Sequence, residues 1–308
     1  MTTTTDSRRP RRTSPTGHPS LRDREASARS RAAKDRAARA LLLAGMVVAL
    51  IPLALILFEV ARRGLHVVDL EFFTHVEPPY RREGGGYAQG FVGTALIMAL
   101  AVAMAVPLGI AAAVYLVEYG RGRLAILVRF FTDVMTGVPS VFVGLFVYAL
   151  LVVGPGQLRF GTFVAAVAIG IMMLPIVVRS SEEMLRLVPD ELRKASYALG
   201  ARRWQTVVKT VLPAAGPGIV TGSMLAVARG AGETAPLLLT ALGSLQVVTA
   251  LQGTPQSSLT LLIYRGAIQP FDAGIQRAWG GALALIAFVL LFTVAARLIG
   301  SRAVALRR

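Results

Sequence analysis

The chain has 308 residues, of which 54% are hydrophobic and 16% charged, and its formal net charge is +16. A soluble domain of this length needs more charge to cover its surface, so the composition indicates a membrane protein. The absence of Cys excludes disulfides, thiolate nucleophiles and cysteine metal sites, and the three His are too scattered along the chain to predict a metal site.

The N-terminal residues 1–38 are rich in Ser, Thr, Pro and Arg and contain almost no large apolar side chain. Such a segment cannot bury enough surface to offset its ordering entropy, so we predict a disordered, basic, cytoplasmic tail. The apolar run that follows ends at Glu59, Arg62 and Arg63 without a small-residue cleavage pattern, which favours a retained span over a signal peptide. Residues 39–89 are therefore interpreted as the first transmembrane helix and its outer loop.

Apolar stretches long enough to cross a bilayer recur along the chain, given that a spanning helix needs about 20 residues. We predict an all-α, polytopic membrane protein with about six transmembrane helices. The predicted spans are 40–61, 91–117, 134–153, 162–178, 214–241 and 278–299. The third and fourth are short and are separated only by residues 154–159.

The distribution of basic residues predicts the orientation. With the N-terminus inside, roughly three quarters of all Lys and Arg lie on the cytoplasmic side. We therefore expect a multi-pass protein of the plasma (inner) membrane with both termini cytoplasmic, including a basic C-terminal tail at 301–308. Of the two long outer segments, 62–90 reads as an extended turn without its own core, and 243–277 contains an apolar patch, 259–264, that is expected to form a short interfacial helix.

The cytoplasmic loop 186–213 contains clear helix signals. Asp190 is expected to cap a helix, and Gly200 is expected to end it in the left-handed conformation. A second helix is expected to run from about Ala201 towards Leu212. The first helix places three apolar residues on one face, namely Leu192, Ala195 and Leu199. On physical grounds alone this is an amphipathic connector at the membrane surface.

The triplet Lys194-Ala195-Ser196, followed by Gly200 and by Leu212-Pro213, resembles the "EAA" loop of binding-protein-dependent ABC permeases. The resemblance implies a coupling helix that docks into a cleft of an ATPase subunit. The coupling residues would then be Leu192, Lys194, Ala195, Ser196, Ala198, Leu199 and Gly200. Lys194 stands where the family has Glu, so a salt bridge from this position needs an acidic partner.

The fifth predicted span contains the run Ala228 to Leu237, which resembles the A-type phosphate permeases of the Pst system, as does Gly137-Val138-Pro139-Ser140. The resemblance covers residues 90–300 and implies a type I ABC importer permease fold for that domain. It also implies the partners: a companion C-type permease, an ATPase dimer that binds ATP and Mg, and an extracytoplasmic phosphate-binding protein. This chain would then be a non-catalytic permease without a cofactor of its own.

Arg229 and Glu233 are four residues apart in an otherwise apolar span and are predicted to share one helix face. An Arg at mid-bilayer costs about 2.5–3.5 kcal/mol on insertion scales, so it should face protein or water, where its planar donors suit a phosphate. A structural ion pair between the two residues is the alternative. Arg179, at the inner end of the fourth span, completes the predicted substrate path, and snorkelling to the interface is its alternative role.

The sequence contains no GxxxxGKS/T, HExxH or GxSxG motif, so a P-loop nucleotide site and a membrane hydrolase are not indicated. Two other transporters stay open: an ABC permease for another oxyanion, such as molybdate or sulfate, and an ion-coupled secondary transporter that works without an ATPase. The basic tail alone would suggest nucleic acid. Because most other basic residues lie between apolar runs, membrane lipid is the expected environment and no nucleic-acid partner is predicted.

Overall fold

The computed structural model describes residues 21–79, 82–155 and 157–305. Within these residues no strand forms, although an isolated bridge joins Leu242 to Gln256, so the all-α prediction is confirmed. The helical segments are α1 (Leu21–Gly64), α2 (Leu70–Thr74), α3 (Ala88–Val114), α4 (Arg123–Gly137), α5 (Ser140–Val147), α6 (Thr162–Arg186), α7 (Asp190–Ala198), α8 (Arg203–Thr206), α9 (Leu212–Ala231), α10 (Ala235–Thr240), α11 (Leu259–Ala267) and α12 (Asp272–Ala305), with π-helical segments η1 (Tyr115–Tyr119), η2 (Tyr148–Val153) and η3 (Val207–Val211).

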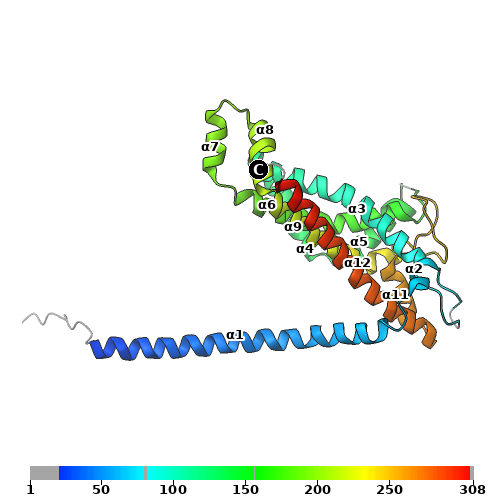
Figure 1. Cartoon of the computed structure of the whole chain (residues 1–308). Helices are drawn as coiled ribbons and strands as arrows, with labels where there is room; N and C mark the ends of the chain where they lie inside the picture. Colours follow the sequence, from blue (N-terminus) through cyan, green and yellow to red (C-terminus); the bar gives the residue numbers. More distant parts are fainter. Residues whose placement is uncertain (1–20, 80–81, 156, 306–308) are drawn as a thin grey trace, which may run out of the picture. The chain divides into compact units, whose positions relative to one another are not determined.

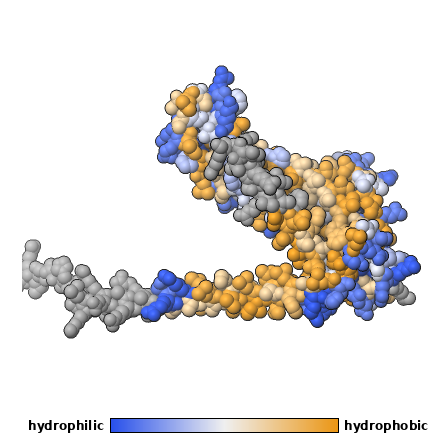
Figure 2. Space-filling view, viewed as in Figure 1, coloured by the Kyte–Doolittle hydropathy of each residue, from blue (hydrophilic) through white to orange (hydrophobic). Residues whose placement is uncertain are grey.

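The chain divides into two units, Met1–Phe58 and Glu59–Arg308, and α1 supplies the described part of the first. Residues 21–38 are helical, so the prediction of disorder is wrong for this stretch, while residues 1–20 lie outside the described part. Ala and Arg dominate the stretch, and both are strong helix formers even where no apolar surface is buried. From Leu41 to Phe58 the large apolar side chains of α1 are exposed, as expected for a helix in lipid (Figure 2).

Five of the described helices are long and apolar enough to cross a membrane, and a bent pair of helices raises the number to six if it is taken as one span. This agrees with the prediction of about six spans. The five are Lys34–Gly64, Ala88–Tyr119, Thr162–Arg186, Arg203–Ala231 and Asp272–Leu291, and the bent pair is Arg123–Gly137 with Ser140–Val153.

Proline breaks two of the predicted spans, so 134–153 and 214–241 are not continuous helices. Between α4 and α5 the axis bends by 112°. Val138 is extended there (ψ 126°), because the residue before a proline is driven out of the helical region. In the fifth span α9 ends at Ala231 and α10 begins at Ala235. Pro236 cannot donate to the carbonyl of Gly232 and its ring would clash with it, which ends the helix.

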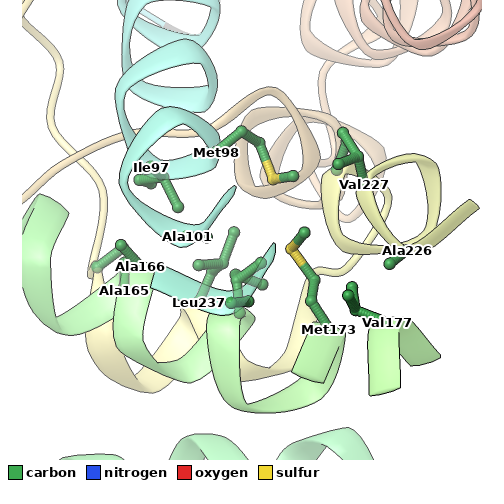
Figure 3. Packing of buried hydrophobic residues seen from close by; sticks show 14 of the residues in the cluster. Ile97, Met98, Ala101, Ala165, Ala166, Met173, Val177, Ala226, Val227 and Leu237 are labelled. Atoms are coloured by element: carbon green, nitrogen blue, oxygen red, sulfur yellow. The ribbon is translucent and has the colours of Figure 1, made fainter. Parts of the chain in front are cut away.

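The core of the second unit lies where α3, α6 and α9 meet (Figure 3). Small residues face one another there, among them Ala101 of α3, Ala165 and Ala166 of α6, and Ala226 of α9, and all four are fully buried. Small side chains let helix backbones approach closely, which is how helices associate in lipid, where water does not drive them together. The packing therefore fits a membrane-embedded bundle.

The end of the second unit that carries α2 and α11 is more ordered than the sequence suggested (Figure 1). The segment predicted as a turn without a core forms α2 and buries Phe72 and Tyr87 against Leu259 and Leu262 of α11. The predicted helix in the patch 259–264 is present as α11. It is packed into the protein through these leucines.

Two charged side chains, Arg277 and Glu77, are buried at this same end. Arg277 of α12 is 2% exposed and donates through Nη1 to the carbonyl of Arg82 at 2.6 Å. Glu77 is 6% exposed, and its Oε1 has no hydrogen-bond partner within the described residues. Burial raises the pKa of the Glu77 carboxyl above its usual value, and the guanidinium groups of Arg277 and Arg265 oppose this shift. Glu77 is thus a carboxylate whose charge is costly in the folded protein.

Candidate functional site

Arg229 borders a cavity of about 110 Å³ at the break between α4 and α5. It reaches the cavity from the last turn of α9, and it is the charged member of the described lining. The other lining residues are Met135, Thr136, Val138, Val143, Ile171, Met172, Pro175 and Ile176. The side chain of Arg229 is 62% exposed, so its guanidinium group is accessible in the isolated chain.

Glu233 does not share a helix face with Arg229, contrary to the prediction, because α9 ends between them. It lies in the irregular segment before α10, where its backbone carbonyl accepts a hydrogen bond from Thr260 Oγ1 at 3.0 Å. Its carboxylate still faces Arg229, with Oε1 3.6 Å from Nε. That separation is an ion pair without a hydrogen bond. In the part of the chain that the structure describes, Arg229 donates no side-chain hydrogen bond, which leaves its planar donors available.

Arg179 lies at a different cavity from Arg229. This second cavity, of about 160 Å³, lies between α4 and α6, nearer to α7, and it is lined by Arg129, Thr132, Asp133, Arg179, Glu182, Glu183 and Arg186. Arg179 donates through Nη1 to Asp133 at 2.6 Å, and its Nε lies 3.6 Å from Glu183. Both partners are largely exposed. The structure thus brings Arg229 and Glu233 together and places Arg179 about one turn of α6 beyond the first cavity.

The helix α7 and the short helix α8 project from the opposite end of the second unit from α2 and α11 (Figure 1). Gly200 lies between them with φ +81°, which confirms the predicted left-handed corner. The second helix starts at Arg203, close to the predicted position. Asp190 is the first residue of α7 and does not cap it, since Pro189 occupies the cap position and Asp190 accepts from Arg193. We call α7, Gly200 and α8 together the knob.

Two polar side chains of α7 face inwards, while apolar side chains of the knob are exposed beside its charged ones. Arg193 points towards Glu118 of η1, and the Ser196 hydroxyl lies 2.9 Å from that of Thr206 in α8. The apolar residues point outwards: Leu199 is 89% exposed and Trp204 55%. The other predicted coupling residues, Leu192, Lys194, Ala195 and Ala198, are exposed as well. An exposed apolar face of this kind marks an interaction surface.

Two buried carboxylates anchor the knob end of the unit and were missed by the sequence analysis. Glu118 of η1 is 5% exposed and accepts both Nε and Nη2 of Arg193 at 3.0 Å. Glu182 of α6 accepts from Arg129 at 2.9 Å and from Arg186 at 2.6 Å. The sequence analysis assigned Glu118 no special role. Its position beside an apolar run was the available signal, since an acidic residue at such a place is rarely buried without a partner.

Comparison with known proteins then defines the family. The sequence model described as "binding-protein-dependent transport system inner membrane component" matches residues 105–304. The chain belongs to this family. Relatives named phosphate transport system permease protein PstA include one from Mycobacterium tuberculosis (strain CDC 1551 / Oshkosh), 44% identical over 89% of this chain and 90% of the relative. Another, from Yersinia pestis, is 40% identical over 86% and 90%.

A solved structure supports the fold. A chain of a bacterial alginate ABC transporter, crystallised with an alginate-bound periplasmic protein, aligns with a TM-score of 0.58 at 14% identity. The alignment covers 87% of this chain and 93% of that one. The similarity confirms the predicted ABC importer permease fold. Family membership also makes this chain a transport component of the inner membrane.

Proposed function

We propose that the chain is the transmembrane permease subunit of an ATP-driven importer of inorganic phosphate. The geometry that carries the proposal is the guanidinium group of Arg229, which borders a cavity at a helix break and donates no hydrogen bond among the described residues. The relatives align with almost the whole chain, and their names specify phosphate as the oxyanion.

Arg229 is the proposed anion-binding residue of the path. A guanidinium group keeps its charge at any physiological pH and offers paired donors that match two oxygens of a phosphate. Rings of Arg are a known means of anion selectivity in pores. Glu233, at 3.6 Å, would neutralise Arg229 when the path is empty and release it when phosphate arrives. Arg179, at the neighbouring cavity, would provide the next positive charge on the way towards the knob.

The knob is the proposed docking element for an ATPase subunit. Leu192, Leu199 and Trp204 present apolar side chains that the described chain leaves exposed, Leu199 most of all. A cleft that receives them would remove this surface from water, which favours association by about 25 cal/mol per Å² of apolar area. Lys194 is exposed on the same helix, so the cleft is expected to offer it an acidic residue.

The remaining partners and the orientation follow from this assignment. With the knob on the ATPase side, both termini lie in the cytoplasm, in agreement with the excess of basic residues there. ATP and Mg bind to the ATPase dimer, which hydrolyses the nucleotide. A companion C-type permease would complete the translocation path, and an extracytoplasmic phosphate-binding protein would deliver the substrate to the end that carries α2 and α11.

The test is purification of the chain from cells that also express a companion permease and an ATPase subunit, followed by uptake assays in vesicles. Co-purification of an ATPase and ATP-dependent uptake of labelled phosphate are expected. Labelled sulfate and molybdate serve as matched anions. Uptake of either anion in preference to phosphate would show that phosphate is not the substrate. Uptake by this chain alone, without ATP, would show that it is an ion-coupled secondary transporter and not an ABC permease.

A further inference from the structure

The carboxylate of Glu118 is the point where the knob is attached to the end of α3. Glu118 lies in η1, which continues α3 by a π-helical segment. Its Oε1 accepts two donors of the same guanidinium group, Nε and Nη2 of Arg193, both at 3.0 Å. The side chains are 5% and 14% exposed, so solvent screens the pair little. A two-point contact from a planar group fixes direction as well as distance.

Arg193 also fastens α7 to the end of α6. It donates through Nη2 to the carbonyl of Leu185 at 2.9 Å and through Nη1 to the carbonyl of Val188 at 2.6 Å. The side chain that leaves α7 therefore joins α6, α7 and η1 at one place. The further partner, Asp190, is 78% exposed at 3.2 Å and adds little to the attachment.

The second half of the knob meets the same residues of η1. Arg203 of α8 donates to the backbone carbonyl of Glu118, and its guanidinium group lies 4.8 Å from the centre of the Tyr119 ring. The chain continues from α8 through η3 into α9, which carries Arg229 at its other end. Glu118 thus contacts α7 through its carboxylate, and α8, which leads through η3 into α9, through its backbone carbonyl.

We infer that Glu118 is the positioning residue that transmits movement of the docked knob to α3 and α9. The inference rests on the proposed function, in which an ATPase subunit binds the knob. A force on α7 reaches α9 along the covalent chain, but it reaches α3 only through non-covalent contacts. The buried pair of Glu118 and Arg193 is a direct contact from α7 to the end of α3, made by two donors of one guanidinium group. Because π-helical segments are often placed at functional sites, η1 is a suitable place for α3 to give way.

The experiment compares two variants of the complete transporter in vesicles. Glu118→Ala removes the acceptor, and Glu118→Gln keeps an acceptor oxygen but removes the charge. Three quantities are measured: the ATPase bound per permease, ATP hydrolysis stimulated by the phosphate-loaded binding protein, and phosphate uptake. In Glu118→Ala we expect the bound ATPase to stay within twofold of wild type while stimulated hydrolysis and uptake fall at least tenfold. In Glu118→Gln, stimulated hydrolysis and uptake should lie between the values of wild type and of Glu118→Ala.

Glu59→Ala is the control, because it removes another carboxylate that holds two arginines, Arg62 and Arg63, far along the chain from the knob. It should leave all three quantities unchanged. Normal stimulated hydrolysis and uptake in Glu118→Ala would overturn the inference, and so would loss of the ATPase from both Glu118 variants, which is the result for a purely structural anchor. If no ATPase binds the wild-type permease, the proposed function itself is wrong.

Discussion

A Cβ atom built on Gly144 of α5 would lie 2.6 Å from the Cα of Pro236 in α10. The two helices in contact here are the ones that the proline breaks release from α4 and α9. α5 follows the break that borders the Arg229 cavity, and α10 follows the break that contains Glu233. The close approach therefore joins the two broken spans beside the candidate site. No other residue type fits at 144 without a backbone shift, since the obstructing atom belongs to the main chain.

Gly144→Ala is expected to push α5 and α10 apart. Overpacking of this kind costs about 1–3 kcal/mol, so the purified chain should unfold at a lower temperature and phosphate uptake should fall. Gly137→Ala is the matched control, because a Cβ there has nothing within 4 Å. Thermal unfolding monitored by fluorescence checks the difference, and equal melting temperatures for the two variants would contradict the assigned packing.

Gly200→Val is expected to disturb the corner of the knob while the chain still inserts. Gly200 has φ +81° and open space around its Cβ position, so the effect is conformational and not steric crowding by neighbours. Asn tolerates the left-handed region better, so Gly200→Asn should retain more function. The measurement is transport-coupled ATP hydrolysis by the assembled transporter. Normal coupling in the Val variant would show that the corner is not needed for docking.

Arg229→Gln is expected to abolish phosphate uptake while the complete transporter still assembles. Arg229→Lys keeps the charge without the planar donors, so its uptake should lie between that of wild type and that of Arg229→Gln. Uptake of labelled phosphate in cells without other phosphate importers, with transporter levels measured in parallel, provides the comparison.

The alternative role of Arg229, a structural ion pair with Glu233, gives a different pattern. In that case removing Arg229 leaves a carboxylate without its counter-charge, and the double change Arg229→Gln with Glu233→Gln should restore both assembly and uptake. Under the proposed function the double variant assembles and still does not transport. Full recovery of uptake would therefore make Arg229 a structural residue.

Glu77→Gln is expected to stabilise the protein at neutral pH but not at acid pH. Burial raises the pKa of Glu77 in the folded state, so the unfolded chain loses this proton first as the pH rises. The folded state then holds more protons, and its stability falls from about pH 4.5 upwards through the raised pKa. Gln removes that dependence. Melting temperatures of both proteins from pH 4 to pH 8 should coincide at the acid end and diverge towards neutrality, and parallel curves would contradict the burial of this carboxyl.

The double variant Ser196→Cys with Thr206→Cys should form a disulfide that leaves uptake intact. The two hydroxyl oxygens are 2.9 Å apart, so the two side chains that Cys would replace already meet, and the sequence has no other Cys to interfere. Because α7 and α8 are both fastened to η1, we expect them to move together. Uptake that is lost on oxidation and restored by a reductant would show that α7 and α8 separate during transport. The two single variants are the controls.

The number of spans and the helices of the knob could be predicted from the sequence, because they depend on signals within short segments: hydropathy, the positions of basic residues, and glycine at a helix end. The breaks at Val138-Pro139 and before Pro236 were not predicted, although the prolines were visible. Proline is tolerated inside spanning helices, as Pro107 in α3 and Pro175 in α6 show, so its presence does not decide between a continuous and a broken helix. At both breaks the helix that follows the proline, α5 or α10, packs against the other, and the sequence does not show this contact.

The two sites differ in how far they could be predicted. Arg229 was identified because a charge inside an apolar run is costly wherever the chain folds. The pair of Glu118 and Arg193 is separated by 75 residues, and neither residue lies in the middle of an apolar run. Only the fold brings them together. Residues 21–38 are the reverse case. Disorder was predicted because the segment has little apolar surface to bury, and the local preference of Ala and Arg for helix was overlooked.

The outward leucine and tryptophan of the knob have a consequence for how the cell makes this protein. Surplus copies synthesised without their ATPase would carry Leu199 and Trp204 into water, where such residues attract chaperones, proteases and one another. Matched production of the two subunits would then be under selection. Copies left unassembled should have a shorter lifetime in the cell than assembled ones, so abundance would be set by the scarcer subunit.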